Sequence, residues 1–202
     1  QGGRMKLLAK THYGLEEVLA EEVKAMGAAG VTPLNRAVAF EGTKLMLYTV
    51  NYRSRLALSV LMPVASFGIS GKNDLYDGAV AVDWDRYLDP GRTFAVTAVV
   101  NSPHFAHSGY PALVVKDAIA DFFRRLQVAR PSVNTRDPDL LVNVHISNER
   151  VTISLDSTVV PLYRRGYRQG SGEAPLSEVL AAGMLALTGW RADTALCDGM
   201  CG

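Results

Sequence analysis

The chain is organised around Tyr163–Met184, which reads Y-R-R-G-Y-R-Q-G-S-G-E-A-P-L-S-E-V-L-A-A-G-M. Compact α/β sequence without a catalytic cluster precedes this stretch, and what looks like the start of a further domain follows it. Its first half is basic, aromatic and glycine-rich. Guanidinium groups bind phosphate oxygens and aromatic rings stack on bases, so we interpret it as a basic hinge beside an anionic partner. The alternative is a solvated linker whose arginines pair with nearby carboxylates.

Composition limits the class of protein. The chain has 202 residues, of which 48% are apolar, and a net charge of +1. These values are typical of one or two globular domains, and any charge that binds nucleic acid must be local. The sequence contains no apolar run of about 18 residues and no apolar leader, so neither a membrane span nor a secretory signal is expected. Its two cysteines, Cys197 and Cys201, favour a reducing, cytoplasmic location.

The first 65 residues predict six elements in the order β-α-β-β-α-β. Their expected ranges are 5–10, 14–26, 31–34, 37–40, 43–52 and 56–64. The first helix has apolar residues on one face and four glutamates on the other, which argues against phosphate contact there. Thr43 is suited to cap the second helix. The order is that of a ferredoxin-like domain, expected at 5–65.

Residues 67–162 predict a second α/β domain. The expected elements are one or two short helices over 74–88, a buried strand at 94–100, a long helix at 112–126 and a hairpin of 140–146 with 151–155. Apolar and polar residues alternate strictly in the hairpin, which predicts one buried face and one wet face. Because strands are few for this length, the domain is expected to rely on its helices for its core.

The last residues predict a third helix at 173–187, with Pro175 near its first turn, and then a buried strand at 195–197. The ending D-G-M-C-G reads as a tight turn at the carboxyl end of that strand. Ligands of open α/β sheets bind at such ends, and glycines let backbone approach a cofactor closely. By itself this ending is more often an ordinary turn.

Several motifs, taken in order and spacing, resemble one family. They are Y-G-L-E-E-V-L-A-E-E at 13–22, V-D-W-D-R-Y-L at 82–88, V-K-D-A-I-A-D-F-F-R at 115–124, R-P-S-V at 130–133, D-P-D-L-L-V-N-V-H-I at 137–146, L-Y-R-R-G-Y-R at 162–168 and E-A-P-L-S-E-V-L-A-A at 173–182. The chain is similar to the N-terminal half of the bacterial THUMP-domain rRNA methyltransferases. These enzymes methylate the exocyclic amine of a guanine in large-subunit rRNA with S-adenosylmethionine.

The resemblance implies an α/β (α+β) architecture in four parts. These are a ferredoxin-like domain at 5–65, an RNA-binding THUMP domain at 67–162, a basic hinge at 163–172, and the first helix and strand of a Rossmann-like methyltransferase domain at 173–202. It also implies a structured RNA partner, with 23S rRNA expected, and S-adenosylmethionine as the cofactor of the full-length enzyme. Neither the nucleotide modified nor the oligomeric state is specified by the sequence.

The same resemblance implies where the cofactor would lie. The expected cofactor-binding residues are Pro175, Leu176, Asp198, Gly199, Cys201 and Gly202. Relatives read D-P-x-C-G-S-G-T at the glycine-rich loop, whereas Gly199 follows Asp198 here and the Ser-Gly-Thr half is absent. The substrate-amine motif, Asn or Asp followed by Pro-Pro-Tyr, is also absent. Because base flipping and in-line transfer need these parts, the 202-residue chain is expected to lack activity and appreciable cofactor affinity.

The RNA-binding candidates are basic residues of the second domain and of the hinge. They are Lys116, Arg124, Arg125, Arg130, Arg136, Arg164, Arg165 and Arg168. A-form RNA hides its major groove, so such side chains are expected to meet phosphates and 2′-hydroxyls. The alternatives are ion pairs with Asp117 or Asp121 on the helix, and a hinge arginine that anchors the linker to a domain.

The sequence is also compatible with other functions. THUMP domains recur among RNA-modifying enzymes, so the module could serve a tRNA methyltransferase or tRNA thiolation. A protein-interaction scaffold that does not bind RNA is a further alternative, favoured only by the near-neutral charge. His104 and His107 lack a carboxylate or cysteine close in sequence, so no metal or acid–base role is expected for them.

Overall fold

The computed structural model describes residues 3–165 and 176–199. The strands are β1 (Met5–Lys10), β2 (Ala29–Leu34), β3 (Ala37–Gly42), β4 (Ser59–Gly68), β5 (Thr93–Asn101), β6 (Ser132–Val133), β7 (Leu140–Ser147) and β8 (Arg150–Asp156). The helices are α1 (Glu16–Ala25), α2 (Lys44–Arg53), α3 (Lys72–Val80), the short 3-10 helix Trp84–Arg86, α4 (Gly109–Arg125) and α5 (Glu178–Leu187). The predicted α/β class and nearly all of the predicted elements are confirmed.

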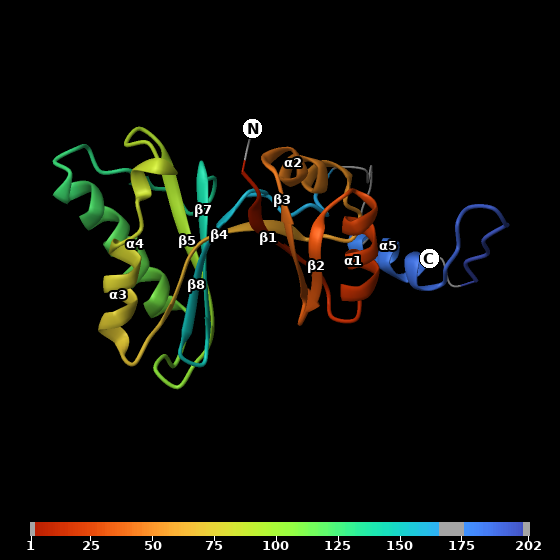
Figure 1. Ribbon diagram of the computed structural model, residues 1–202, viewed down its shortest axis with the longest axis horizontal. Helices are drawn as coiled ribbons and strands as arrows, with labels where there is room; N and C mark the ends of the chain where they lie inside the picture. The colour runs from red at the N-terminus through yellow and green to blue at the C-terminus, as the bar shows by residue number, and fades with distance from the viewer. Residues whose placement is uncertain (1–2, 166–175, 200–202) are drawn as a thin grey trace.

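The strands form one continuous sheet in the order β2-β3-β1-β4-β8-β7-β5-β6. In Figure 1, α3 and α4 lie at one end of the molecule, and α5 with the C-terminal residues lies at the other. α1 and α2 flank the strands of the first half, with α1 toward α5. β4 joins the two halves because its beginning pairs with β1 and nearly all of its length pairs with β8. The expected strand at 56–64 therefore runs further than predicted, to Gly68. Its register shifts between Pro63 and Ala65, as expected where proline cannot donate to the ladder.

The first half has the predicted ferredoxin-like order and its own core. Leu7, Leu19, Val38 and Phe40 are almost fully buried there. The Thr43 side chain accepts a hydrogen bond from the Met46 N–H at 3.4 Å, which confirms it as the cap of α2. Glu17 and Glu21 of α1 are exposed, as its spacing predicts. Glu22 is not, because its carboxylate accepts hydrogen bonds from the Ser54 hydroxyl and the Arg55 N–H.

The second half has a separate core between the sheet and its helices. Trp84 lies at its centre, fully buried, and its indole N–H donates to the Ala79 carbonyl at 2.8 Å. α3 and α4 contact each other and cover one face of the sheet. The edge strand β6 pairs in parallel with β5 and was not predicted, because two residues carry no periodicity.

The polar face of the β7–β8 hairpin is only partly wet. Ser154 and Asn143 are 3% and 9% exposed, although their alternation places them opposite the core. Asn143 donates to the Thr97 hydroxyl of the neighbouring strand at 3.3 Å, so its amide is satisfied within the sheet. Ser154 and Asn143 are thus shielded at the centre of this face, while His145 is exposed near its end.

The C-terminal part departs most from the predictions. α5 begins at Glu178, after Ser177, rather than at 173. A Cβ on Gly183 would lie 2.4 Å from the Leu15 side chain, so α5 packs closely against the start of α1. The strand expected at 195–197 is not formed: these residues are exposed coil, because no neighbouring strand pairs with them in the part of the chain that the structure describes.

In the same described ranges, no helix combines the length and apolarity needed to cross a membrane.

Candidate nucleic-acid interface

Two of the predicted RNA-binding residues on α4 are paired with carboxylates of the same helix. Lys116 forms an ion pair with Asp117 at 3.0 Å, and Arg124 pairs with Asp121. Asp121 also accepts a hydrogen bond from the Tyr76 hydroxyl at 2.8 Å, and this bond raises the pKa of Tyr76. The alternative of ion pairing on the helix therefore holds for Lys116 and Arg124. Such exposed pairs are weak, so both side chains can still exchange partners.

The loop after α4 carries the two least restrained guanidiniums. Among the described residues, neither Arg130 nor Arg136 has a carboxylate oxygen within 4.0 Å. The loop itself is ordered by Asn134, whose side-chain oxygen accepts the Arg136 N–H at 3.1 Å and whose amide donates to the Asp137 carbonyl at 2.7 Å. Such an Asx turn fixes the backbone from which Arg136 extends.

One acid that follows this loop, Asp139, is paired on the side of β5. Asp139 accepts hydrogen bonds from the Thr93 N–H and hydroxyl, both at 2.8 Å, and pairs with Arg92 at 2.9 Å. The Thr93 N–H, then the Thr93 hydroxyl and Arg92, hold the pKa of Asp139 below its usual value. Its charge is thus compensated within the β5–β7 edge and does not oppose Arg136.

The face formed by 116–136 is therefore net positive. It holds Lys116, Arg124, Arg125, Arg130 and Arg136 against Asp117 and Asp121. Lys116 and Arg130 come together around a small cavity of about 110 Å³ that Phe94 and Pro131 also line. Partial desolvation, and then the nearby Lys10, lower the pKa of His145. Other cations of this half, Lys72, Arg86, Arg92 and Arg150, lie outside the 116–136 segment.

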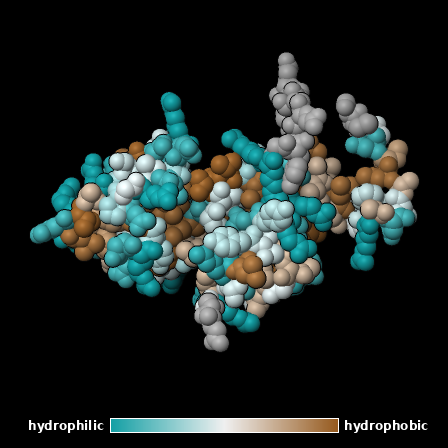
Figure 2. Space-filling model, turned by 90° about the horizontal axis from the view of Figure 1, so that it is seen from above, coloured by the Kyte–Doolittle hydropathy of each residue, from teal (hydrophilic) through white to brown (hydrophobic). Residues whose placement is uncertain are grey.

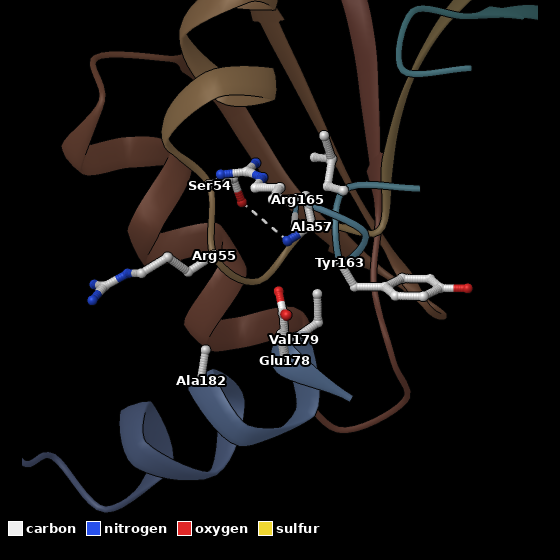
Figure 3. Close-up of a pocket in the computed structure, with 9 residues that line it drawn as sticks. Ser54, Arg55, Ala57, Tyr163, Arg165, Glu178, Val179 and Ala182 are labelled. Carbon is white, nitrogen blue, oxygen red and sulfur yellow. Dashed lines mark hydrogen bonds between the residues drawn. The ribbon is translucent and has the colours of Figure 1, made fainter. Parts of the chain in front are cut away.

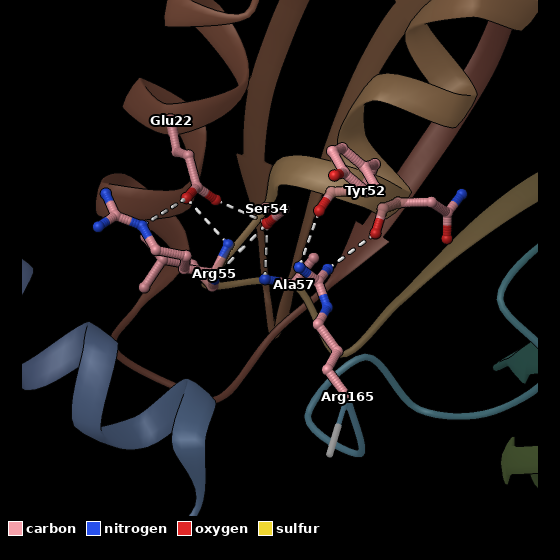
Figure 4. Close-up of polar contacts among 8 residues, drawn as sticks. Glu22, Tyr52, Ser54, Arg55, Ala57 and Arg165 are labelled. Atoms are coloured by element: carbon pink, nitrogen blue, oxygen red, sulfur yellow. Dashed lines mark hydrogen bonds and ion pairs between the residues drawn. The ribbon is translucent and has the colours of Figure 1, made fainter. Parts of the chain in front are cut away.

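The structure assigns the first hinge arginines different roles. The Arg165 guanidinium donates to the Asn51 carbonyl at 2.7 Å and to the Tyr52 carbonyl at 2.9 Å, at the end of α2 (Figure 4). A cation at a helix C-terminus is favourable, so Arg165 anchors the hinge to the ferredoxin-like half. Arg164 is exposed and lies 5.6 Å from the centre of the Tyr163 ring. Arg168 lies outside the described residues.

A cavity of about 350 Å³ lies between the ferredoxin-like half, the hinge and α5 (Figure 3). Its lining includes Arg165 and Glu178 among the apolar side chains of Ala57, Leu162 and Val179. The Arg165 guanidinium already donates to the two α2 carbonyls. Beside it, the Glu22 carboxylate accepts hydrogen bonds from the Ser54 hydroxyl and the Arg55 N–H (Figure 4). We therefore interpret this cavity as part of the packing interface between α5 and the first half, and not as a reaction centre.

Comparison with protein families matches three consecutive parts of the chain. The RlmL ferredoxin-like domain matches residues 6–61, the THUMP domain 71–156, and the RMKL-like methyltransferase domain 165–202. A protein of Synechocystis sp. named as an RNA methyltransferase is 41% identical over 189 residues, which are 94% of this chain and 49% of that protein. In sequence and in the order of these three parts, the chain is similar to the THUMP-domain methyltransferases.

Solved structures support the same fold for this THUMP-domain chain. A protein from Listeria monocytogenes described as a predicted N6-adenine-specific DNA methylase has a TM-score of 0.79 at 26% identity, over 93% of this chain and 49% of that one. TrmN from Thermus thermophilus has a TM-score of 0.69 at 27% identity, over 91% and 54% of the two chains. The chain thus spans about half the length of these relatives.

Three of the six cofactor candidates are described, and they lie at the surface. Leu176, Asp198 and Gly199 are all exposed, with α5 between the first and the other two. Pro175, Cys201 and Gly202 lie outside the described residues. That these six residues hold the cofactor stays a prediction. Within the described ranges, no three His, Cys, Asp or Glu side chains gather in a way that could hold a metal ion.

Proposed function

We propose that this chain is the RNA-binding and substrate-delivery module of an S-adenosylmethionine-dependent methyltransferase that acts on a guanine N2 in large-subunit rRNA. The observation that carries the proposal is the positive 116–136 face of a THUMP domain, where Arg130 and Arg136 have no ion-pair partner among the described residues. Unpaired guanidiniums that project from an ordered loop are suited to phosphates and 2′-hydroxyls of folded RNA. The match of 165–202 to a methyltransferase model supports the methyl-transfer part.

Binding of an rRNA hairpin across a range of salt concentrations tests the proposal. Phosphate contacts release counterions, so the logarithm of the association constant should fall by roughly 0.7 to 0.9 per contact for each tenfold rise in salt. Filter binding with a 23S rRNA hairpin and a hairpin of unrelated sequence would measure this slope. Absent or salt-insensitive binding would favour a protein-interaction scaffold instead.

A second candidate is a module that delivers DNA. It is favoured by the Listeria relative, whose description is that of a DNA methylase. The same filter assay with DNA and RNA hairpins of one sequence separates the two, because only RNA offers 2′-hydroxyls and A-form geometry. Tighter binding to the DNA hairpin would replace the RNA proposal.

The isolated chain is expected to have negligible affinity for S-adenosylmethionine. The described candidates Leu176, Asp198 and Gly199 are exposed rather than gathered around a ligand. Isothermal titration of the 202-residue chain with S-adenosylmethionine should therefore give no heat beyond dilution. Micromolar binding would show that the C-terminal part forms a cofactor site by itself.

A further inference from the structure

Helix α2 carries a large exposed face that the core does not use. Its buried side consists of Leu47 and Val50. On the opposite side, Leu45, Tyr48 and Tyr52 are 73%, 57% and 85% exposed. Lys44, Tyr48 and Tyr52 follow one another at intervals of four residues, so they lie on one face of the helix. Two aromatic rings therefore stand in solvent at helical spacing, one turn apart.

The charge carried by α2 itself has a single sign, whereas Arg55, just beyond the helix, pairs with Glu22 of α1 at 3.8 Å. Residues 42–73 contain no aspartate or glutamate, whereas Lys44, Arg53 and Arg55 are cationic. The Lys44 ammonium lies 5.9 Å from the centre of the Tyr48 ring. α1, on the same half, carries four glutamates instead. Figure 2 shows the molecule from above, the side on which α2 lies in Figure 1. Apolar and hydrophilic residues are mixed over this half of the surface.

The basic hinge adjoins this face of α2. The two hydrogen bonds from Arg165 to the last carbonyls of α2 bring the hinge to the end of the helix where Tyr52 lies (Figure 4). Arg164, the neighbouring residue, is exposed. The hinge at Arg165 and the end of α2 that carries Tyr52 are therefore adjacent.

We propose that the outward face of α2, with Arg164, binds unpaired nucleotides of an RNA, whose bases stack on Tyr48 and Tyr52. Rings one helical turn apart are separated by about 6 Å along the axis, which allows one base on each ring. Stacking on an aromatic ring is independent of base identity, and Lys44, Arg53 and Arg164 supply the phosphate contacts. The absence of carboxylates from α2 favours a polyanion over a protein partner. This inference rests on the proposed RNA-binding function and adds a second, single-strand site to it.

Two RNA hairpins separate this site from the 116–136 face. One is blunt and the other carries a six-nucleotide single-stranded extension of uridines. The unchanged chain should bind the extended hairpin more tightly than the blunt one. Tyr48→Ala/Tyr52→Ala should lose about ten-fold or more of affinity for the extended hairpin and keep its affinity for the blunt one. Tyr48→Phe/Tyr52→Phe should retain the preference, because stacking needs only the ring.

Tyr13→Ala is the matched control, since Tyr13 is 76% exposed and lies outside α2. Circular dichroism would verify that every variant is folded. If the alanine double variant binds the extended hairpin like the unchanged chain, the α2 site is wrong although the proposed function stands. If the unchanged chain binds neither hairpin, the proposed function itself fails. Cross-linking of 5-iodouridine in the extension to Tyr48 or Tyr52 would support the site directly, and cross-linking only within 116–136 would contradict it.

Discussion

The double variant Arg130→Ala/Arg136→Ala is expected to bind a blunt RNA hairpin about 100-fold more weakly than the unchanged chain at low salt. Each guanidinium lacks an ion-pair partner among the described residues, so each is available to a phosphate. A hydrogen bond to a charged group contributes about 1.5 kcal/mol, which is roughly ten-fold in affinity per side chain. The plot of the logarithm of the association constant against the logarithm of salt concentration should also become less steep. The change expected is that for the loss of about two phosphate contacts. Filter binding from 50 to 300 mM salt measures both quantities.

Lys24→Ala provides a control with the same loss of charge per substitution. Lys24 lies on α1, where it pairs with Glu21 at 2.7 Å. Its removal should change RNA affinity by less than two-fold, whereas Arg130→Ala and Arg136→Ala should each change it about ten-fold. Equal losses for all three single variants would mean that only net charge matters, and would contradict a defined RNA-binding face.

Replacement of Trp84 by alanine is expected to give the largest loss of stability. The side chain is fully buried between α3, α4 and the sheet, and its N–H is satisfied by the Ala79 carbonyl. Its loss removes a large apolar surface, leaves a cavity and removes one of the two hydrogen bonds that the Ala79 carbonyl accepts, which together cost about 3 to 5 kcal/mol. Because a domain is stable by only about 5 to 15 kcal/mol, the second half of the molecule should unfold at markedly lower urea concentration. Urea titration followed by circular dichroism measures the change.

The second tryptophan is a natural comparison. Trp190 also donates its indole N–H to a backbone carbonyl, that of Thr194, at 2.9 Å, but it is only partly buried near the described C-terminal end. Trp190→Ala should therefore reduce the free energy of unfolding by about 1 kcal/mol or less. A similar loss for both variants would contradict the assignment of Trp84 to the centre of the second core.

Most elements could be predicted because their periodicity is unambiguous. The long amphipathic α4 and the alternating β7 and β8 are examples, and Asn148 adopts the positive φ that their tight turn requires. Joining of the two halves into one sheet was not predictable, since it depends on β4 pairing with two distant strands. The strand expected at 195–197 failed for the same reason, because an apolar triplet becomes a strand only beside a partner. Whether 5–65 and 67–162 fold as independent domains stays a prediction.

The sequence predicted which basic residues belong to the candidate site. It did not predict which of them form ion pairs or hydrogen bonds within the protein. The positive face at 116–136 follows from the sequence, whereas the pairing of Lys116 and Arg124 and the freedom of Arg130 and Arg136 depend on geometry. Arg165 belongs to the basic run, and only the structure shows that it holds α2. Tyr48 and Tyr52 were not singled out, because aromatic residues at helical spacing usually belong to a core. Their exposure could be learned only from the folded chain.

The most direct test of the central claim is an NMR titration of the ¹⁵N-labelled chain with a blunt rRNA hairpin. The account predicts that amide signals of residues 116–136 shift or broaden, together with those near the hinge. Signals of α1, with its acidic outer face, should stay unchanged. Changes centred on α1, or changes absent from 116–136 at saturating RNA, would contradict the claim that this THUMP-domain chain binds RNA through the positive face beside α4.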